Sequence, residues 1–434
     1  MNPSPGEIVG QHDNEVTRKR AIIMQRRIRA AIGGTAAIAS LALVLAGCTA
    51  TDSGTTEPTD DGTTTPAFAL MDPATGECAS PPADGVDFDA AKAYVEKFQQ
   101  PSVGITPTLL GWDPLPEAPP AGLKIGYANN MSPVGDGLWR PFIEEAAKTA
   151  GGVFVNYPAG PDPASAATGF DAILADPPDI LIVGAIDPTI VTAQGQALID
   201  AGVVVVWGAD PRAPETFGLP DTFGGMGGSI VNGEVLAAAA VYFTCGTGSE
   251  FAWYNIPEFY FSTINHQAAD EFMSQLAPDA NLRSVDISIF ATDNPSGILQ
   301  DLQGHPDTQF FITPADQDQV GLPAAAETAG VTNAVGIGQS SLPQNVAQIK
   351  DGSQYGGFTL DFQQFLFQLV DEGLRTYEGV FPAEGYGDDW ASINANISSL
   401  ITAQNVNDLD ISVDGIYTSY PNTVQDYAKA WGTN

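Results

Sequence analysis

Basic residues are scarce in this chain. Its 434 residues include 16 Lys and Arg against 52 Asp and Glu, which gives a formal net charge of -36 at pH 7. A surface this acidic repels nucleic acid and anionic lipid headgroups. The sequence therefore predicts no nucleic-acid partner, and any attachment to a lipid bilayer must use something other than a basic patch.

Residues that typically carry out catalysis are also scarce. The three histidines, His12, His266 and His305, show no metal-ligand spacing. No nucleophile elbow or Ser/His/Asp order is present. Paired acids such as Asp388 and Asp389 are best explained as solvated turns in so acidic a chain. We therefore expect no metal, no cofactor and no enzymatic activity.

Only three cysteines are present, and the first is the last residue of the motif Leu45-Ala46-Gly47-Cys48. An apolar run from Ala30 to Ala46 precedes it, after a cluster of basic residues, and is short for a transmembrane helix. This order is typical of a lipoprotein signal peptide, here residues 1–47. We expect an exported protein that is anchored to the outer face of the cell membrane through lipid on Cys48. An uncleaved transmembrane anchor is the alternative.

The other two cysteines are Cys78 and Cys245. An exported protein meets an oxidising environment, so these two residues are a possible disulfide that ties the N-terminal segment to the rest of the chain. Spacing alone does not establish the geometry, and a buried free Cys245 is the alternative.

The chain changes character along its length. Residues 48–66 are rich in Thr, Asp, Gly and Pro, which predicts a flexible tether. Residues 67–122 form an N-terminal extension with one helix from Phe88 to Phe98, capped by Asp87 and ended before Pro101.

Short apolar runs then alternate with helical segments. The expected strands are 123–128, 153–157, 180–183, 203–207, 251–256, 285–290, 309–312, 334–337 and 399–403. Continuous apolar strands are covered on both faces, which predicts an α/β fold with two doubly wound parallel-sheet lobes joined by a multi-strand hinge. We expect an N-terminal lobe at 123–245 and 362–390, a C-terminal lobe at 250–358 and 396–406, and a tail at 407–434.

Four segments carry a resemblance to a known family: LKIGYANN at 123–130, DILIVGAIDPTIV at 179–191, AGVVVVWGADPRAP at 201–214, and HPDTQFFITPADQDQVGLPAAAETAG at 305–330. Together they resemble the ribose-type (type I) periplasmic sugar-binding proteins, the substrate-binding components of ABC importers. The resemblance extends from about Leu123 to Val406 and implies a ligand cleft between the lobes.

The resemblance implies ligand-binding residues in the loops that follow the strands. These are Asn129, Asn130, Trp139, Asp210, Arg212, Glu258, Phe259, Asp293, Asp316 and Asp361. Amides, carboxylates, an Arg and an aromatic platform suit the hydroxyls and C–H faces of a sugar. The family's Arg on the first C-lobe helix is absent, with His266 or Gln267 nearest, and Gly338 replaces an expected Asp. A copy of the ribose site is therefore not expected.

These features predict a solute-binding protein that closes around a small polyhydroxylated ligand and delivers it to an ABC permease. Sugar, polyol and nucleoside ligands all fit the residues. A ligand sensor of the same fold that signals to a membrane receptor is the alternative. A secreted carbohydrate-active enzyme is less favoured because no catalytic constellation is visible.

Overall fold

A computed structural model of the chain describes residues 68–433, except residues 161, 289, 290, 292, 332–334, 384, 413 and 414. The predicted signal peptide, Cys48 and the predicted tether lie outside the described residues, so the lipid anchor stays a prediction. All described residues belong to one unit of the chain.

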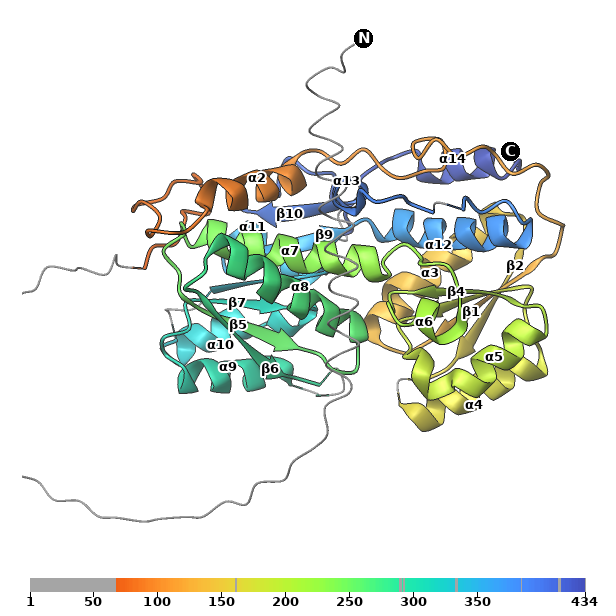
Figure 1. Ribbon diagram of the computed structural model, residues 1–434, viewed down its shortest axis with the longest axis horizontal. Helices are drawn as coiled ribbons and strands as arrows, with labels where there is room; N and C mark the ends of the chain where they lie inside the picture. The colour runs from red at the N-terminus through yellow and green to blue at the C-terminus, as the bar shows by residue number, and fades with distance from the viewer. Residues whose placement is uncertain are drawn as a thin grey trace, which may run out of the picture. The chain divides into compact units, whose positions relative to one another are not determined.

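The first lobe contains a four-stranded parallel sheet with the order β2-β1-β3-β4. Its strands are β1 Lys124–Asn129, β2 Val153–Pro158, β3 Ile180–Gly184 and β4 Val204–Gly208. The helices α3 Arg140–Thr149, α4 Pro163–Ala175, α5 Thr192–Asp200 and α12 Phe362–Tyr377 pack around this sheet (Figure 1). Alternate residues of β3 enter two different apolar cores, so all of β3 is buried, as its continuous apolar sequence predicts.

The second lobe repeats this arrangement with the order β6-β5-β7-β8. Its strands are β5 Glu250–Asn255, β6 Asn281–Asp286, β7 Phe310–Thr313 and β8 Val335–Gly338, and its helices include α7 Met226–Phe243, α8 Tyr260–Leu276, α9 Asn294–Gly304, α10 Leu322–Thr328 and α11 Pro343–Asp351. The two parallel sheets confirm the predicted α/β fold class.

One predicted strand of this lobe was misplaced. The apolar run at 285–290 suggested a strand there, but β6 ends at Asp286. Because β6 is an edge strand and no residue in it is fully buried, its sequence is polar and gives no continuous apolar signal.

The predicted lobe boundary at residue 245 was also wrong for helix α7. This helix packs on α8 of the second lobe, where its apolar residues form one core with β5 and β7. Gly233 makes the close approach possible, because a Cβ there would lie 2.1 Å from the carbonyl oxygen of Asn265. By length and composition α7 could cross a membrane, but it is mostly buried inside the lobe.

The two sheets are linked by an antiparallel pair of strands, β9 Gly356–Leu360 and β10 Ser398–Thr402. Strand β9 leads directly into α12, whose N-terminus is capped by Asp361. Helix α13 Trp390–Ala395 precedes β10 and contacts α7. The chain therefore passes from the second lobe to the first and back through this pair.

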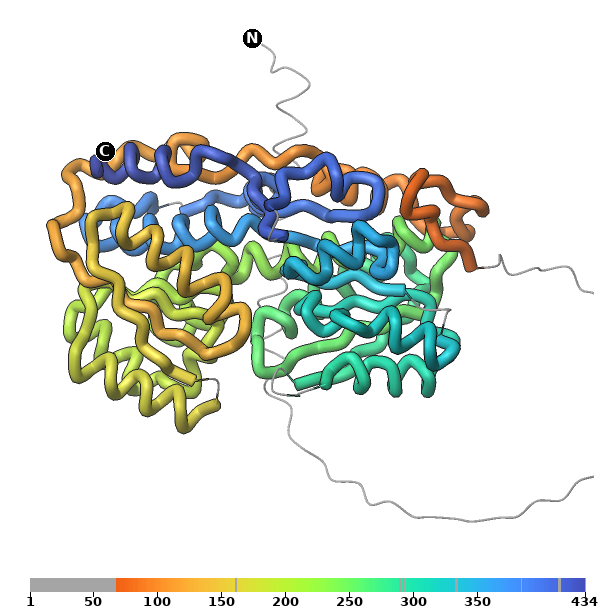
Figure 2. Tube along the Cα trace, turned by 180° about the vertical axis from the view of Figure 1, so that it is seen from behind, coloured from red at the N-terminus to blue at the C-terminus, as the bar shows by residue number. Residues whose placement is uncertain are grey.

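The N-terminal extension and the C-terminal tail run along the same edge of both lobes (Figures 1 and 2). Helix α2 Phe88–Gln99 is capped by Asp87, as predicted, and packs on α7. A disulfide joins Cys78 to Cys245, with 5.7 Å between the Cα atoms. Further along, the backbone NH of Leu115 donates to the carbonyl of Ala430, at the end of helix α14 Thr423–Ala430.

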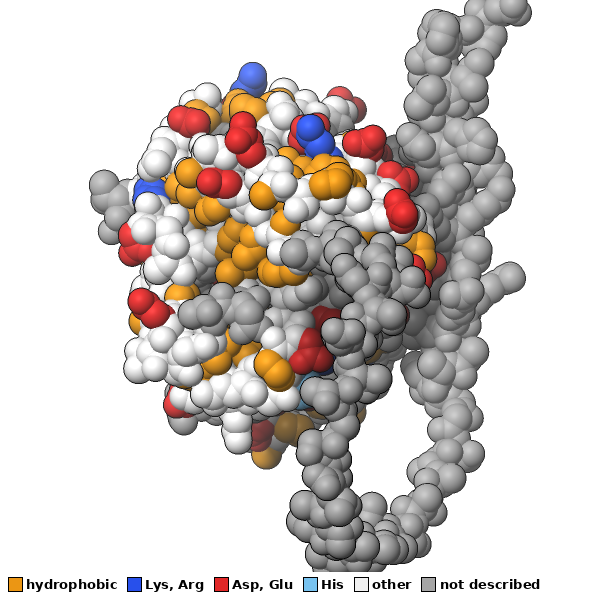
Figure 3. Space-filling view, turned by 90° about the vertical axis from the view of Figure 1, so that its left-hand side faces the viewer, with side chains coloured by type: hydrophobic (Ala, Val, Ile, Leu, Met, Phe, Trp, Pro, Cys, Tyr) orange, Lys and Arg blue, Asp and Glu red, His pale blue; other side chains and the backbone are white. Residues whose placement is uncertain are grey.

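The surface matches the acidic composition. On the face at the second-lobe end, Asp and Glu side chains are scattered widely and Lys and Arg are few (Figure 3).

Candidate functional site

The main pocket lies where the carboxyl ends of both parallel sheets face each other, beside strand β9. It contains about 1050 Å³ of empty space, part of it open to solvent. In parallel α/β sheets, ligands bind beyond the carboxyl ends of the strands. Polar lining residues are Asn130, Ser132, Ser229, Asn232, Gln317, Gln339, Ser340, Asn394 and Ser398, and apolar ones include Trp139, Phe223, Phe259, Phe261, Phe358, Leu360, Phe362 and Phe365.

Four residues that follow strands of the two sheets have a left-handed backbone although none is glycine. They are Met131 after β1, Ala185 after β3, Ala209 after β4 and Ser340 after β8, with φ between 48° and 62°. Each lines the main pocket or the pocket that adjoins it. Such strained backbone gathers at functional sites, which supports a binding role for this region.

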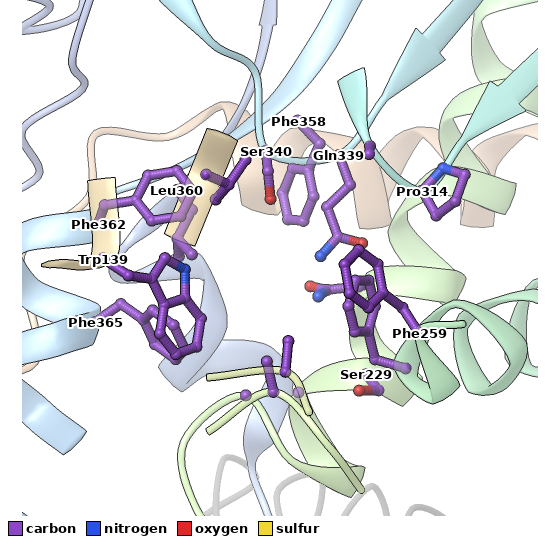
Figure 4. A pocket seen from close by; sticks show the side chains of 18 of the residues that line it. Trp139, Ser229, Phe259, Pro314, Gln339, Ser340, Phe358, Leu360, Phe362 and Phe365 are labelled. Carbon is purple, nitrogen blue, oxygen red and sulfur yellow. The ribbon is translucent and has the colours of Figure 1, made fainter. Parts of the chain in front are cut away.

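The first-lobe wall of the pocket is built around Trp139. This residue ends a π-helical turn, Gly135–Trp139, and its indole meets the ring of Phe365 edge to face at 5.2 Å (Figure 4). Gly184 and Gly208, which end β3 and β4, leave room for the indole, because a Cβ on either would lie 3.0–3.2 Å from it. Gly135 lets the turn approach Asn130.

The opposite wall comes from the second lobe. Figure 4 shows Phe259, Pro314 and Gln339 facing the Trp139 side across the opening. The rings of Phe259 and Phe261 stack at 5.3 Å. The Gln339 amide hydrogen-bonds the Asn265 amide of α8 at 2.7 Å, which holds it at the pocket edge.

Of the predicted site residues, Asn130, Trp139 and Phe259 line the main pocket. Glu258 lines the adjoining outer pocket together with Asp162 and Asp187. One Glu258 oxygen accepts from Ser288, and the other is buried with no hydrogen-bond partner among the described residues. Ligand contact by these four predicted residues stays a prediction.

Arg212 and Asp210 bind each other instead of lining the pocket. The Arg212 guanidinium donates to both carboxylate oxygens of Asp210, and its Nη1 lies 2.9 Å from Asp187 Oδ2. The predicted pair is therefore brought together, but as an ion pair at the end of the first sheet.

Asp316 is fully buried behind the pocket. Its carboxylate accepts hydrogen bonds from Ser341, Gln354 and Gln319, and its backbone NH donates to the carbonyl of Gln339. Burial raises the pKa of Asp316 to about 7. Asp316 thus positions the loops that carry Gln317 and Gln339.

The three remaining predicted residues fix local backbone and do not line the pocket. Asp361 caps α12 and accepts from both the backbone and the hydroxyl of Ser419. Asp293 caps α9 and is exposed. Asn129 accepts the backbone NH of Met131 and donates to Asp136.

Sequence reasoning missed most of the aromatic lining. The missed residues flank Asp361 in the segment that crosses between the lobes, and they are Phe358, Phe362 and Phe365. Only Asp361 was predicted from this segment. Three phenylalanines within eight residues of a crossing segment could have indicated an aromatic pocket wall. Among the described residues, no group of three or more His, Cys, Asp or Glu side chains could hold a metal ion.

No protein-family model matches the sequence. No curated protein matches it either. Solved structures do match the fold. One is an ABC transporter solute-binding protein from Mycobacterium smegmatis with bound glycerol, with 17% identity and a TM-score of 0.56, covering 69% of this chain and 100% of that one.

Two further solved structures match the fold at a similar level. An ABC transporter solute-binding protein from Agrobacterium vitis with bound allitol has 15% identity, a TM-score of 0.55, and coverage of 66% of this chain and 97% of that one. A carbohydrate transporter from Acidothermus cellulolyticus in complex with myo-inositol has 14% identity, a TM-score of 0.55, and coverage of 66% and 96%. The chain therefore has the fold of the sugar-binding, type I solute-binding proteins, as the sequence predicted.

Proposed function

We propose that this protein captures a small polyhydroxylated ligand between its lobes and delivers it to an ABC permease. The observation that carries the proposal is the pocket itself, because loops from both sheets and the connecting strand β9 line it. A ligand there contacts both lobes at once. It therefore binds the closed arrangement better than an open one and shifts the population toward closure.

The similar structures support this ligand class, since those from Mycobacterium smegmatis, Agrobacterium vitis and Acidothermus cellulolyticus hold glycerol, allitol and myo-inositol. We extend the proposal to the N-terminus: lipid on Cys48 keeps the receptor at the outer face of the membrane, near its permease. Metabolic labelling with palmitate tests that extension. The wild type is expected to take up the label and Cys48→Ser to lose it, whereas an unlabelled wild type would contradict it.

A thermal-shift screen of residues 49–434 against sugars, polyols and their derivatives tests capture. A ligand that binds only the folded protein stabilises it by mass action and so raises its melting temperature. At a ligand concentration of one hundred times the Kd, the stabilisation is about 2.7 kcal/mol. Absence of any shift across the screen would count against the proposal.

Two glycine variants make the test specific to the pocket. Gly228 lines the pocket at the start of α7, and a Cβ there meets nothing within 4 Å, so Gly228→Leu fills the pocket without a clash at Cβ. Gly297 on α9 is equally open but exposed and outside the pocket, so Gly297→Leu is the matched control. Loss of the shift in the first variant alone is the expected result.

A further inference from the structure

The pocket has no charged side chain among the described residues that line it. The acids and the Arg that would surround a free sugar are engaged elsewhere: Asp210 with Arg212, Asp316 with Ser341, and Asp361 with Ser419. Whatever binds in the pocket must therefore be recognised by neutral amides, hydroxyls and aromatic rings.

The neutral polar groups are distributed unevenly around the pocket. Gln317, Gln339 and Ser340 follow second-lobe strands, Ser229 and Asn232 lie on α7, and Asn394 and Ser398 are at the hinge. The first-lobe wall is mainly apolar, with Trp139, Phe362, Phe365 and Val134, and its two polar residues, Asn130 and Ser132, lie where it meets the adjoining pocket. Most hydrogen-bonding side chains therefore lie on the second-lobe and hinge side, together with the rings of Phe259 and Phe261, and the Trp139 side offers mainly ring surface.

A free hexose or polyol carries hydroxyls around its whole rim. The C–H face of a sugar ring suits the Trp139 indole, but rim hydroxyls directed at the Phe362 and Phe365 side of the wall lose water without gaining a partner, which weakens binding by roughly tenfold for each. A flat apolar ring against the same wall gains the burial of its face and edge-to-face contacts.

The adjoining pocket adds a second restriction. It shares Asn130 and Phe259 with the main pocket and is also lined by three acids, Glu258, Asp162 and Asp187. Asp187 is paired with Arg212, so Glu258 and Asp162 make this pocket acidic, and on a chain with a net charge of -36 it repels phosphate-bearing ligands.

We infer that the ligand is a neutral molecule in which a flat aromatic ring is joined to a hydroxylated part, the chemistry shared by aryl glycosides and nucleosides. The ring lies against Trp139, Phe362 and Phe365, and the hydroxylated part meets the amides and hydroxyls of the second lobe and hinge. This inference rests on the proposed function and narrows its ligand class.

Isothermal titration with five probes tests it: phenyl β-D-glucopyranoside, adenosine, D-glucose, myo-inositol and adenosine monophosphate. Phenyl glucoside or adenosine should bind about 10- to 100-fold more tightly than glucose or inositol, and the monophosphate more weakly than adenosine. The stronger of the first two identifies the source of the ring. Glucose or inositol binding as tightly as both ring-bearing probes would overturn the inference and leave the proposed function standing. If none of the five binds, the inference also falls.

Phe362→Leu checks the role of the wall, because it removes the ring and keeps an apolar side chain. It should weaken binding of the preferred ring-bearing probe by about 2- to 10-fold and leave any glucose binding unchanged. Phe251→Leu, in the second-lobe core at the amino-terminal end of β5 and so away from the pocket, is the matched control and should change neither. An equal loss for both probes in Phe362→Leu would indicate a general structural effect and contradict the assignment.

Discussion

The guanidinium of Arg212 lies 4.2 Å from the centre of the Tyr260 ring, which places a first-lobe cation over a second-lobe aromatic. Arg212 follows β4, and Tyr260 begins α8. Asp187 and Asp210 neutralise the same guanidinium. The ion pair assembled from first-lobe loops thus also forms a contact that holds the two lobes together beside the pocket.

Removing the Tyr260 ring should therefore weaken ligand binding without touching the ligand. A cation–π contact contributes about 0.5–2 kcal/mol, so Tyr260→Leu should reduce affinity by about 2- to 10-fold by favouring open arrangements. Small-angle scattering of the ligand-free variant should show a larger radius of gyration. Tyr260→Phe keeps the ring and should behave like the wild type, and Tyr377→Leu controls for loss of a partly exposed Tyr. Equal defects in Tyr260→Phe and Tyr260→Leu would implicate the hydroxyl and contradict the role of the ring.

The sequence predicts those elements whose signal is local. Strands β1, β3 and β5 have buried apolar runs, and α2 begins at the predicted residue, Phe88, after its Asp87 cap. Strand β6 was misplaced because an edge strand needs no continuous apolar run. The packing of α7 on the second lobe depends on the close contact of Gly233 with α8. The sequence of α7 alone does not show this contact, because it joins two separate segments of the chain.

The site shows the same difference between features that depend on local sequence and features that depend on contacts between distant segments. Positions after strands led to Asn130, Trp139 and Phe259, which line the pocket, and ligand contact by them stays a prediction. Asp210 and Asp316 occupy similar positions, but their side chains turn to partners that the sequence does not reveal. A buried carboxylate needs hydrogen bonds, and it takes them from whichever donors the fold supplies.

Loss of the Cys78–Cys245 disulfide should destabilise the second lobe. The two cysteines are 167 residues apart, and the chain-entropy model gives a stabilisation of about 5 kcal/mol for such a loop. The double variant Cys78→Ser with Cys245→Ser should unfold at a lower urea concentration than the wild type. Dithiothreitol should lower the wild-type midpoint similarly and leave the double variant unchanged. An unchanged midpoint in the double variant would show that the packing of α2 on α7 is sufficient.

Asp316 should make stability depend on pH in a defined direction. Burial raises the pKa of Asp316 to about 7, above its value in the unfolded chain, so the folded protein binds the proton more tightly. The Asp316 contribution therefore falls as pH rises from about 4 to 7 and is constant above. Asp316→Asn removes this dependence, and its stability relative to wild type should rise by about 2–3 kcal/mol between pH 5 and pH 8.

Urea unfolding at both pH values measures this difference. Asp293→Asn is the control, because hydrogen bonds from Ser296 lower the pKa of that exposed carboxyl, and no gain at high pH is expected. A constant difference between Asp316→Asn and wild type at the two pH values would refute the assignment.

Gly135 should be needed for ligand binding more than for folding. A Cβ at Gly135 would lie 2.5 Å from Asn130 Oδ1 and 3.0 Å from Asn129 Oδ1, so Gly135→Ala must displace the Asn130 amide from the pocket edge. Misplacing one hydrogen-bonding group by this much should weaken binding by about tenfold. Gly137 lies in the same π-helical turn, and a Cβ there meets nothing within 4 Å. Gly137→Ala should therefore leave affinity unchanged and stabilise the turn by about 0.5 kcal/mol. Titration of both variants with the same ligand separates the two effects, and an equal loss of affinity in both would mean that the flexibility of the turn, rather than the position of Asn130, governs binding.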